Sequence, residues 1–308
     1  MRIYANMSLN AAEQEALDEV TKGHEVYLAG TGDDAAEFAR AEIAVGGLPG
    51  AWLADAPALR WLAVTSVGLD GYVGLDWDSI PVRVTNARGA FDEPVAETCL
   101  AGLLAVYRGL DVLAELQRTR TWDGQGVRSR IRLLDGSRVV MLGSGAIARR
   151  LAEMLAPFHC DITTFGRTTG DITTLDELDA VLPEADVVAA ILPGTPQTAG
   201  LLDARRLGLL KRGVVIVNAG RGSLMDEEAF RAGIASGQIG GAVLDVTRHE
   251  PLPADDPLWS TPNVILTQHS SGGSDQERFR AIRLFGQNLQ RYVAGEPLIN
   301  EIDWAKGY

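Results

Sequence analysis

The sequence predicts an α/β protein built on a doubly wound sheet of parallel strands. Two observations support this prediction. Short runs rich in valine and isoleucine alternate with helical patterns along most of the 308 residues. The runs in the second half are apolar throughout, as expected for parallel strands that are buried on both faces. The length of the chain is sufficient for two domains.

The first hundred residues contain four predicted strands and two predicted helices. The strand runs are RIYANM (2–7), HEVYLAG (24–30), EIAVGG (42–47) and WLAVTSVG (61–68), and helical patterns cover 10–20 and 34–41. A longer helical pattern then runs from about Glu93 to Thr119. That pattern is too long for an ordinary crossover helix, so we expect it to link two domains.

Six further strand runs follow, and helical stretches separate most of them. The strands are RVVML (138–142), DITTF (161–165), DVVAAIL (186–192), GVVIVN (213–218), GAVLDV (241–246) and NVILT (263–267), and the helices are 146–157, 175–182, 203–210 and 226–236. This alternation is typical of a doubly wound α/β sheet. A last helix near 274–293 precedes a tail, 296–308, that is too short for a domain and that we expect to return to the first one.

Composition and charge exclude several classes of function. The net charge is −13, which argues against a nucleic-acid or anionic-membrane surface but leaves small anions that local arginines can hold. Cys99 and Cys160 lie far apart and have no metal-binding spacing, so we expect a reduced, cytoplasmic chain without a metal site. The N-terminus lacks an apolar signal, and no run approaches the roughly 20 apolar residues of a membrane span.

RVVMLGSGAIA (138–148) predicts a dinucleotide site of the Rossmann type. Gly143 permits a tight turn, and Gly145 lets the backbone approach a pyrophosphate at a helix N-terminus. Ala148 satisfies the need for a small residue at the third position. The motif alone is weak, and a plain strand-to-helix turn is the alternative. The strand before it, the helix after it and the next strand all fall where the dinucleotide fold requires them.

The loop after the second strand of this fold favours NADP(H) over NAD(H). An NAD site commonly ends that strand with a carboxylate for the ribose hydroxyls. Here Phe165 is followed by Gly166, Arg167 and Thr168, and Asp161 stands at the wrong end of the strand. Arg167 and Thr168 offer a guanidinium and a hydroxyl to a 2′-phosphate. NAD(H) stays possible, and Arg167 as a solvated loop arginine is the alternative.

Three polar residues follow three late strands, at the sheet edge where ligands of such folds bind. They are Arg221, Glu250 and His269. Each has an ordinary alternative: a helix cap, a solvated carboxylate and a satisfied loop histidine. Together they match the reduction of a 2-oxo acid. Arg221 can hold the substrate carboxylate and polarise the carbonyl, His269 can protonate the developing alkoxide, and Glu250 can fix the imidazole.

With these residues in place, the chain resembles the D-isomer-specific 2-hydroxyacid dehydrogenase family. The motifs that carry the resemblance are VGLDG (67–71), VTNARGAFDEPVAE (84–97), LDGSRVVMLGSGAIA (134–148), ILPGTPQTAGLLD (191–203), VNAGRGSLMDEEAF (217–230), GAVLDVTRHEPLPADDPLW (241–259) and NVILTQHSSGG (263–273). The resemblance implies a homodimer with a Rossmann cofactor domain (99–285) inserted into a flavodoxin-like substrate domain (1–98 plus 286–308). It places the active site in the cleft between the domains.

The resemblance also assigns roles to individual residues. Arg221 binds the substrate carboxylate, His269 is the general acid and base, and Glu250 is its partner. The substrate-binding residues besides Arg221 are Val67 and Gly68, through backbone N–H groups, and Asn86. The cofactor-binding residues are Gly143, Ser144, Gly145, Ala146, Ile147, Arg167, Thr168, Pro193, Thr198, Ala219 and Asp245, with Asp245 on the nicotinamide amide. A plain turn at Val67–Gly68 and a helix cap at Asp245 are the alternatives.

Some departures from the family pattern narrow the prediction. Gln268 replaces the usual proline before the histidine, Thr247 replaces an aromatic residue, and Arg88 replaces a common proline, as in the glyoxylate/hydroxypyruvate reductase-like branch. We therefore expect reduction of a small 2-oxo acid to a D-2-hydroxy acid with NADPH. A formate- or phosphite-type dehydrogenase is one alternative, which Ser271 suggests. Glu250 opposes it, because formate dehydrogenase has glutamine at the position where this chain has Glu250. A non-catalytic, NAD(H)-sensing corepressor-like scaffold is another.

Overall fold

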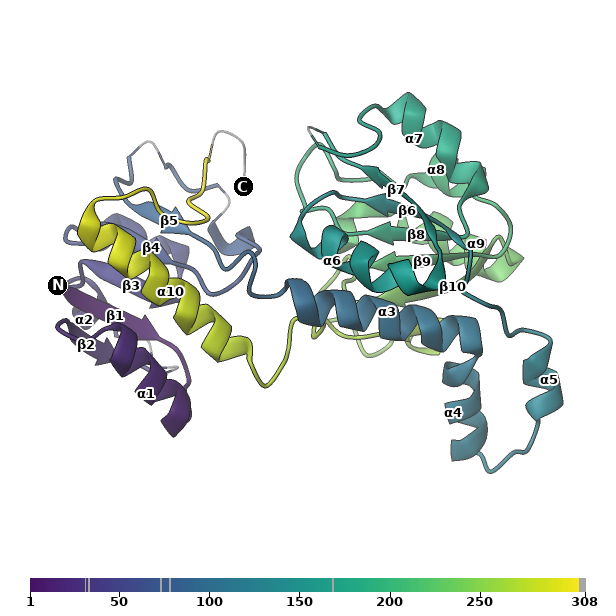
Figure 1. Cartoon of the computed structure of the whole chain (residues 1–308), viewed down its shortest axis with the longest axis horizontal. Helices are drawn as coiled ribbons and strands as arrows, with labels where there is room; N and C mark the ends of the chain where they lie inside the picture. Colours follow the sequence, from purple (N-terminus) through teal and green to yellow (C-terminus); the bar gives the residue numbers. More distant parts are fainter. Residues whose placement is uncertain (31, 33, 73, 78, 168, 305–308) are drawn as a thin grey trace. The chain divides into compact units, whose positions relative to one another are not determined.

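The computed structural model describes residues 1–304 except 31, 33, 73, 78 and 168. The chain forms two compact α/β units (Figure 1). Unit 1 comprises Met1–Phe91 and Ser274–Tyr308, and unit 2 comprises Asp92–Gly273. The boundaries expected from the sequence, 98/99 and 285/286, cut through two helices. The two compact units instead divide at 91/92 and 273/274, outside both helices.

Unit 1 contains a five-stranded sheet in which every neighbouring pair is parallel. The strand order is β2-β1-β3-β4-β5, which is the flavodoxin-like order that we expected. The strands are β1 (Arg2–Asn6), β2 (Glu25–Leu28), β3 (Ile43–Gly46), β4 (Trp61–Ala63) and β5 (Arg83–Thr85). β5 was not predicted as a strand, since three residues are too few to show a periodic pattern.

Helices and loops cover both faces of this sheet. On one face lie α1 (Ala11–Val20) and α10 (Glu277–Ala294). The fully buried Trp61 stacks there on Phe285, with 5.3 Å between ring centroids. α2 (Ala35–Phe38) packs on the other face. The tail lies along β5, where Arg83 donates two hydrogen bonds of 2.7 Å to the Glu301 carboxylate. The described part of the tail, up to Trp304, therefore belongs to unit 1, as expected.

Unit 2 contains a six-stranded, all-parallel sheet of order β11-β10-β9-β8-β6-β7. The strands are β6 (Arg138–Leu142), β7 (Asp161–Phe165), β8 (Val187–Ala190), β9 (Val214–Asn218), β10 (Ile239–Leu244) and β11 (Val264–Leu266). Because β6 lies between β7 and β8, the chain winds first to one side of β6 and then to the other. This confirms the predicted doubly wound sheet and puts the switch point beside the glycine-rich turn.

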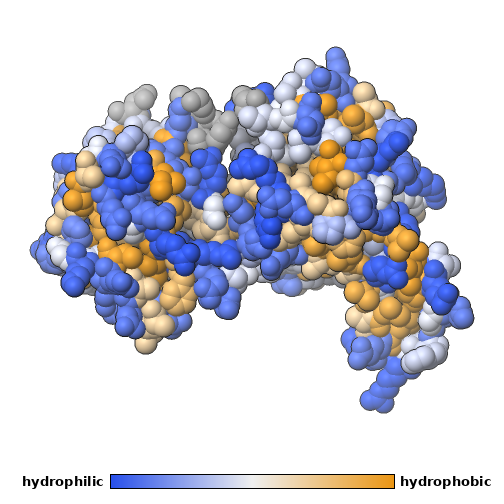
Figure 2. Space-filling view, viewed as in Figure 1, coloured by the Kyte–Doolittle hydropathy of each residue, from blue (hydrophilic) through white to orange (hydrophobic). Residues whose placement is uncertain are grey.

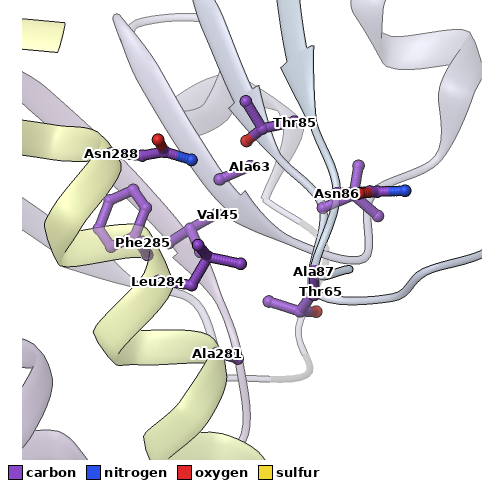
Figure 3. A pocket seen from close by; sticks show the side chains of 11 residues that line it. Val45, Ala63, Thr65, Thr85, Asn86, Ala87, Ala281, Leu284, Phe285 and Asn288 are labelled. Atoms are coloured by element: carbon purple, nitrogen blue, oxygen red, sulfur yellow. The ribbon is translucent and has the colours of Figure 1, made fainter. Parts of the chain in front are cut away.

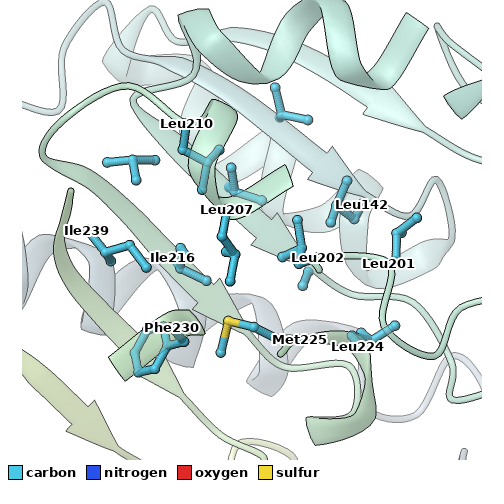
Figure 4. Packing of buried hydrophobic residues seen from close by; sticks show 14 of the residues in the cluster. Leu142, Leu201, Leu202, Leu207, Leu210, Ile216, Leu224, Met225, Phe230 and Ile239 are labelled. Carbon is cyan, nitrogen blue, oxygen red and sulfur yellow. The ribbon is translucent and has the colours of Figure 1, made fainter. Parts of the chain in front are cut away.

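Apolar side chains fill both faces of the unit 2 sheet. On one face, Leu142, Ile216, Leu207 and Phe230 belong to a single cluster (Figure 4). The helices that supply this face are α7 (Leu175–Val181), α8 (Ala204–Leu209) and α9 (Glu227–Ser236). α3 (Asp92–Arg108) and α6 (Ala146–Leu155) pack together on the other face.

The long helix predicted from Glu93 to Thr119 is two helices. α3 ends at Arg108, and α4 (Leu110–Arg118) starts after Gly109, whose φ of +65° lies in the left-handed region. A glycine within a helical pattern can either be tolerated or break the helix, so the pattern alone could not decide. A short helix, α5 (Gly124–Arg128), follows α4. Across the described residues, no helix combines the length and apolarity needed to cross a membrane.

Candidate active site

The three predicted catalytic residues follow three neighbouring strands of unit 2. Arg221 comes after β9, Glu250 after β10 and His269 after β11. Since β9, β10 and β11 are parallel, their carboxyl ends lie at the same edge of the sheet. In doubly wound folds this is the edge where ligands bind.

His269 and Glu250 form a direct pair. The distance from His269 Nδ1 to Glu250 Oε2 is 2.6 Å. The other carboxylate oxygen, Oε1, accepts a hydrogen bond of 2.9 Å from the Thr247 backbone N–H. A carboxylate held on Nδ1 sets the orientation of the ring and leaves Nε2 for a substrate. Because the imidazole is half exposed, Nε2 is within reach of a ligand.

The backbone that carries His269 is unusual. Gln268 and His269 have φ values of +54° and +55°, both in the left-handed region. A residue other than glycine costs about 1–3 kcal/mol in such a conformation. Proline is fixed near a φ of about −65° and cannot adopt it. This is a physical reason for glutamine at the position where the family resemblance led us to expect proline.

Glycine allows the Arg221 loop to lie against the loop that carries Glu250. A Cβ at Gly222 would stand 2.0 Å from the Thr247 carbonyl oxygen, so no larger residue fits. Asn218, at the end of β9, fixes the same loop. Its side chain donates to the Arg221 carbonyl and accepts from the Gly220 N–H, each at 3.1 Å. The structure thereby brings the Arg221 loop beside the His269–Glu250 pair.

Asp245, the first residue after β10, is buried and faces the loop that carries His269. Its carboxylate accepts a hydrogen bond of 2.5 Å from Thr267 Oγ1, and bonds of 3.1 Å from the N–H groups of Ser270 and Ser271. Sequence reasoning missed Asn218, Thr267 and the role of Ser271 in this network. The one available signal was a polar residue, Asn218, that ends an otherwise apolar strand.

The glycine-rich turn has the geometry that a dinucleotide pyrophosphate needs. Gly143 has a φ of +130°, and a Cβ there would lie 3.0 Å from the Ile191 carbonyl oxygen. At Gly145 a Cβ would meet no atom within 4 Å, so the space at the N-terminus of α6 is open. Ala148 is buried. Ala146 and Ile147 form the first turn of the helix. These residues therefore fit the expected group.

The loop after β7 has no carboxylate available at its start. Gly166 allows a tight turn, because a Cβ there would stand 2.0 Å from the Thr169 carbonyl oxygen. Thr169 Oγ1 also lies 2.8 Å from Ser144 Oγ, which ties this loop to the glycine-rich turn. Arg167 is exposed, and Thr168 lies outside the described residues.

Asp171 is the first carboxylate after β7, and it closes the loop on the strand. Its Oδ2 accepts from Thr164 N at 2.8 Å and from Thr164 Oγ1 at 2.9 Å. These two bonds hold the pKa of Asp171 below its usual value, and the bond from the backbone N–H contributes most. The oxygen that accepts both bonds is thereby committed to the strand.

The remaining predicted cofactor residues follow β8 and β9. Thr198 Oγ1 donates to the Pro193 carbonyl at 2.6 Å, which brings these two residues together in one turn. The Ala219 N–H donates to the Ala190 carbonyl at 3.0 Å, so the ends of β9 and β8 are joined. Among the described residues, no group of three potential ligands could hold a metal ion.

The predicted substrate-binding residues of unit 1 form a second cluster. Asn86 Nδ2 donates to the Val67 carbonyl at 2.9 Å, and Ser66 Oγ donates to the Gly68 carbonyl at 2.8 Å. A small pocket between Asn86, Thr65 and Phe285 lies beside them (Figure 3). Its volume of about 10 Å³ is near the minimum for one water molecule, so the pocket is too small for a substrate. Contact between this cluster and a substrate stays a prediction.

Comparison with known proteins identifies a family model and several relatives. The model for the NAD-binding domain of D-isomer-specific 2-hydroxyacid dehydrogenases matches residues 100–271. D-3-phosphoglycerate dehydrogenase of Mycobacterium tuberculosis is 33% identical over 79% of this chain, which spans only 47% of that enzyme. Glyoxylate reductase of Thermofilum pendens is 30% identical, over 78% of this chain and 74% of that protein. Mitochondrial formate dehydrogenase 2 of rice is 34% identical, over 73% of this chain and 63% of that protein.

Solved structures are similar across the whole chain. A D-isomer-specific 2-hydroxyacid dehydrogenase of Xanthobacter autotrophicus, solved in complex with NADPH and MES, has a TM-score of 0.84 and 29% identity, and the match covers 100% of this chain and 99% of that one. A protein of the D-isomer-specific 2-hydroxyacid dehydrogenase family from Aeromonas salmonicida has a TM-score of 0.85 and 29% identity. The match covers 98% of this chain and 99% of that one. Both units thus share the fold of this family.

We predict that Cys99 is chemically inert in the folded protein. Burial in α3, with a contribution from the Asp245 charge, raises the pKa of its thiol to about 12. At pH 8 only about one Cys99 in ten thousand is then a thiolate, the reactive form. Iodoacetamide labelling followed by peptide mass spectrometry should leave Cys99 unmodified in native protein and modify it in guanidinium. The half-buried Cys160 is the internal comparison; labelling of native Cys99 as fast as Cys160 would contradict the burial described.

Proposed function

The chain belongs to the D-isomer-specific 2-hydroxyacid dehydrogenases, a family of NAD(P)-dependent oxidoreductases that act on CH–OH donors, and we propose that it reduces a small 2-oxo acid to a D-2-hydroxy acid with NADPH. The observation that supports this best is the 2.6 Å contact between His269 Nδ1 and Glu250 Oε2, beside the Arg221 loop. A proton donor, a carboxylate that orients it and a cation for the substrate are the groups that this reaction needs.

Each residue has a defined task in the proposed reaction. The Arg221 guanidinium binds the substrate carboxylate and draws electron density from the adjacent carbonyl. NADPH, when bound at the glycine-rich turn, supplies the hydride that the keto carbon takes up. His269 Nε2 donates the proton that the carbonyl oxygen needs to become a hydroxyl. Glu250 stabilises the imidazolium before the transfer, and solvent returns the proton afterwards, since the imidazole is half exposed.

The proposed preference for NADPH rests on the loop after β7. Arg167 is exposed there, immediately after Gly166, and its guanidinium could bind a 2′-phosphate as a bidentate partner. The nearest following carboxylate, Asp171, is bonded to Thr164 and closes the loop. The relative from Xanthobacter autotrophicus was solved with NADPH bound, which agrees with a role for this cofactor.

A formate-type reaction is the second candidate, because rice formate dehydrogenase is among the relatives. Formate oxidation transfers a hydride and releases carbon dioxide, so no oxygen atom has to gain or lose a proton. The His269–Glu250 pair is a device for moving a proton, and its presence favours a 2-oxo acid substrate. Glyoxylate, the substrate in the name of the Thermofilum relative, is the first compound to test.

We further propose that a second copy of the chain binds at the arm formed by α4 and α5, residues 110–133. The arm extends from the sheet of unit 2, and hydrophobic side chains gather along it (Figures 1 and 2). Leu110, Trp122 and Leu133 are 53%, 101% and 73% exposed, and α4 buries no residue. The arm contains five arginines and three acidic residues, whereas the whole chain carries a net charge of −13. Both apolar and charge complementarity favour a homodimer.

Replacement of His269 by Ala should lower the kcat of glyoxylate reduction at least about 100-fold, because general acid catalysis contributes about 10²–10⁴-fold. Glu250→Gln should lower kcat less, since the amide can still contact the ring. The measurement is NADPH oxidation at 340 nm over a panel of 2-oxo acids, with cofactor affinity followed by fluorescence titration. If His269→Ala keeps wild-type kcat, His269 is not the proton donor. If the wild-type protein oxidises formate but reduces no 2-oxo acid, the second candidate replaces the first.

Arg167→Ala should raise the KM for NADPH at least about tenfold and change the KM for NADH by less than about twofold. One charge-assisted contact to the 2′-phosphate is worth about 1.5–3 kcal/mol, and NADH lacks that phosphate. Arg40→Ala is the matched control, because it removes one exposed arginine from unit 1 and changes the net charge equally. Equal effects of Arg167→Ala on the two cofactors would remove the basis for the NADPH preference.

Trp122→Glu should convert the dimer to monomers at micromolar concentration, as measured by sedimentation equilibrium. The side chain is fully exposed in a single copy, so the substitution has little reason to alter the folding of that copy. Val293→Glu, which introduces the same charge at a 60% exposed site on α10, is the control and should leave the mass unchanged. A wild-type protein that is already monomeric would exclude the proposed interface.

A further inference from the structure

The Asp245 carboxylate is surrounded by donors from a single loop, residues 267–271. Oδ1 accepts from Thr267 Oγ1 at 2.5 Å and from the N–H groups of Ser270 and Ser271 at 3.1 Å. Oδ2 accepts from the hydroxyl of Ser271. The backbone takes part as well, because the Asp245 carbonyl accepts from the His269 N–H at 2.6 Å. One buried residue thus contacts the loop on both sides of His269.

These contacts hold the carboxylate mainly through one oxygen. Oδ1 accepts from three donors of the loop, and Oδ2 accepts from one, the Ser271 hydroxyl. Since each oxygen of an ionised carboxylate has about two lone-pair sites, the loop uses Oδ1 fully, whereas Oδ2 keeps a site for the nicotinamide amide that the family resemblance assigns to Asp245. The side chain is 5% exposed, so any donor lost without replacement would leave a buried charge unsatisfied.

The loop needs such an anchor, because its own conformation is costly. Gln268 and His269 stand in the left-handed region, which residues other than glycine rarely adopt. Ser271 is 5% exposed, and its carbonyl accepts from Thr98 Oγ1 of α3 at 3.4 Å. The loop is therefore attached at Ser271 to helix α3 and at Thr267 to Asp245, the residue that follows β10. Between the two attachments lies the imidazole that meets Glu250.

We propose that Asp245 and Ser271 are positioning residues for His269. Their hydrogen bonds hold the loop in the strained conformation that places Nδ1 2.6 Å from Glu250. The catalytic consequence rests on the proposed function, whereas the anchoring is a property of the free protein. This gives Asp245 a task that does not depend on bound cofactor.

The anchoring is tested on cofactor-free protein by nitrogen-15 NMR of the imidazoles. The chain has only four histidines, and His269→Ala assigns the signal in question. In the wild-type protein, the Nδ1 proton shared with Glu250 should give a distinct downfield resonance. Asp245→Asn and Ser271→Ala should each broaden or abolish that resonance. A resonance unchanged in both variants overturns the proposal, whether or not the protein reduces 2-oxo acids.

Kinetics provide the second readout. Both variants should lower kcat by about 10- to 100-fold, because a displacement of about 1 Å at a reacting group costs about 10²-fold. In Ser271→Ala, which leaves the Asp245 carboxylate in place, the dissociation constant for NADPH should stay within about twofold of the wild-type value. The double variant should be no slower than the slower single one, because the two residues act as one unit. If Asp245→Asn instead weakens NADPH binding at least tenfold and leaves the His269 resonance intact, Asp245 holds the cofactor.

Asp186→Asn is the matched control. The Asp186 carboxylate also accepts a hydrogen bond from a backbone N–H, that of Arg138, at 2.9 Å. Asp186 precedes β8, however, and so lies at the opposite edge of the same sheet. The variant should leave the His269 resonance and kcat unchanged. If Asp245→Asn fails to fold, Ser271→Ala decides alone, since it removes one hydroxyl and keeps the charge. A failure of the wild-type protein to reduce any 2-oxo acid contradicts the proposed function and leaves the NMR result standing.

Discussion

The close contact of three loops at the carboxyl edge of the unit 2 sheet is the constraint on which the candidate site depends. Parallel strands bring Arg221, Glu250 and His269 to one edge, but strand order alone leaves the loops free to diverge. Gly222 lets the first loop touch the second, where a Cβ would stand 2.0 Å from the Thr247 carbonyl oxygen. Asp245 joins the second loop to the third. The apolar sheet therefore gives the approximate positions, and close backbone packing with buried hydrogen bonds gives the precise ones.

The same division between apolar framework and polar edge explains the cofactor region. β6 and β8 are buried along almost their whole length, whereas the turns that follow β6 and β7 are shaped by glycines and hydroxyls. Gly145 leaves open space at the start of α6, while Gly166 and Thr169 bring the next loop against Ser144. A dinucleotide site built this way can change its choice of nucleotide through a few loop residues without disturbing the core.

The sequence predicted the parts of the structure that local patterns determine. All six strands of unit 2 were recognised, along with the helices between them. β7 (DITTF) departs from the expected buried, apolar run, since its first four residues are exposed or half-buried. β5 was missed because three residues carry no period, and Gly109 was missed because a helical pattern does not show whether a glycine breaks it. Arg221, Glu250 and His269 were found from their places after strands. The direct contact of the last two could not be read from a spacing of 19 residues.

Asp245 shows why residue identity alone gives an incomplete role. From the sequence, it was a carboxylate at a strand end, available to a ligand. Its donors are 22 to 26 residues away and reach it only after β11 has paired with β10. The same pairing bears on the residue before the histidine, which is glutamine in place of the expected proline. With the loop fixed at Asp245 and Ser271, the chain must cross left-handed backbone at 268 and 269, which a proline would forbid. A residue other than proline at 268 and a buried carboxylate at 245 are thus both required by one loop conformation, and that conformation places the imidazole.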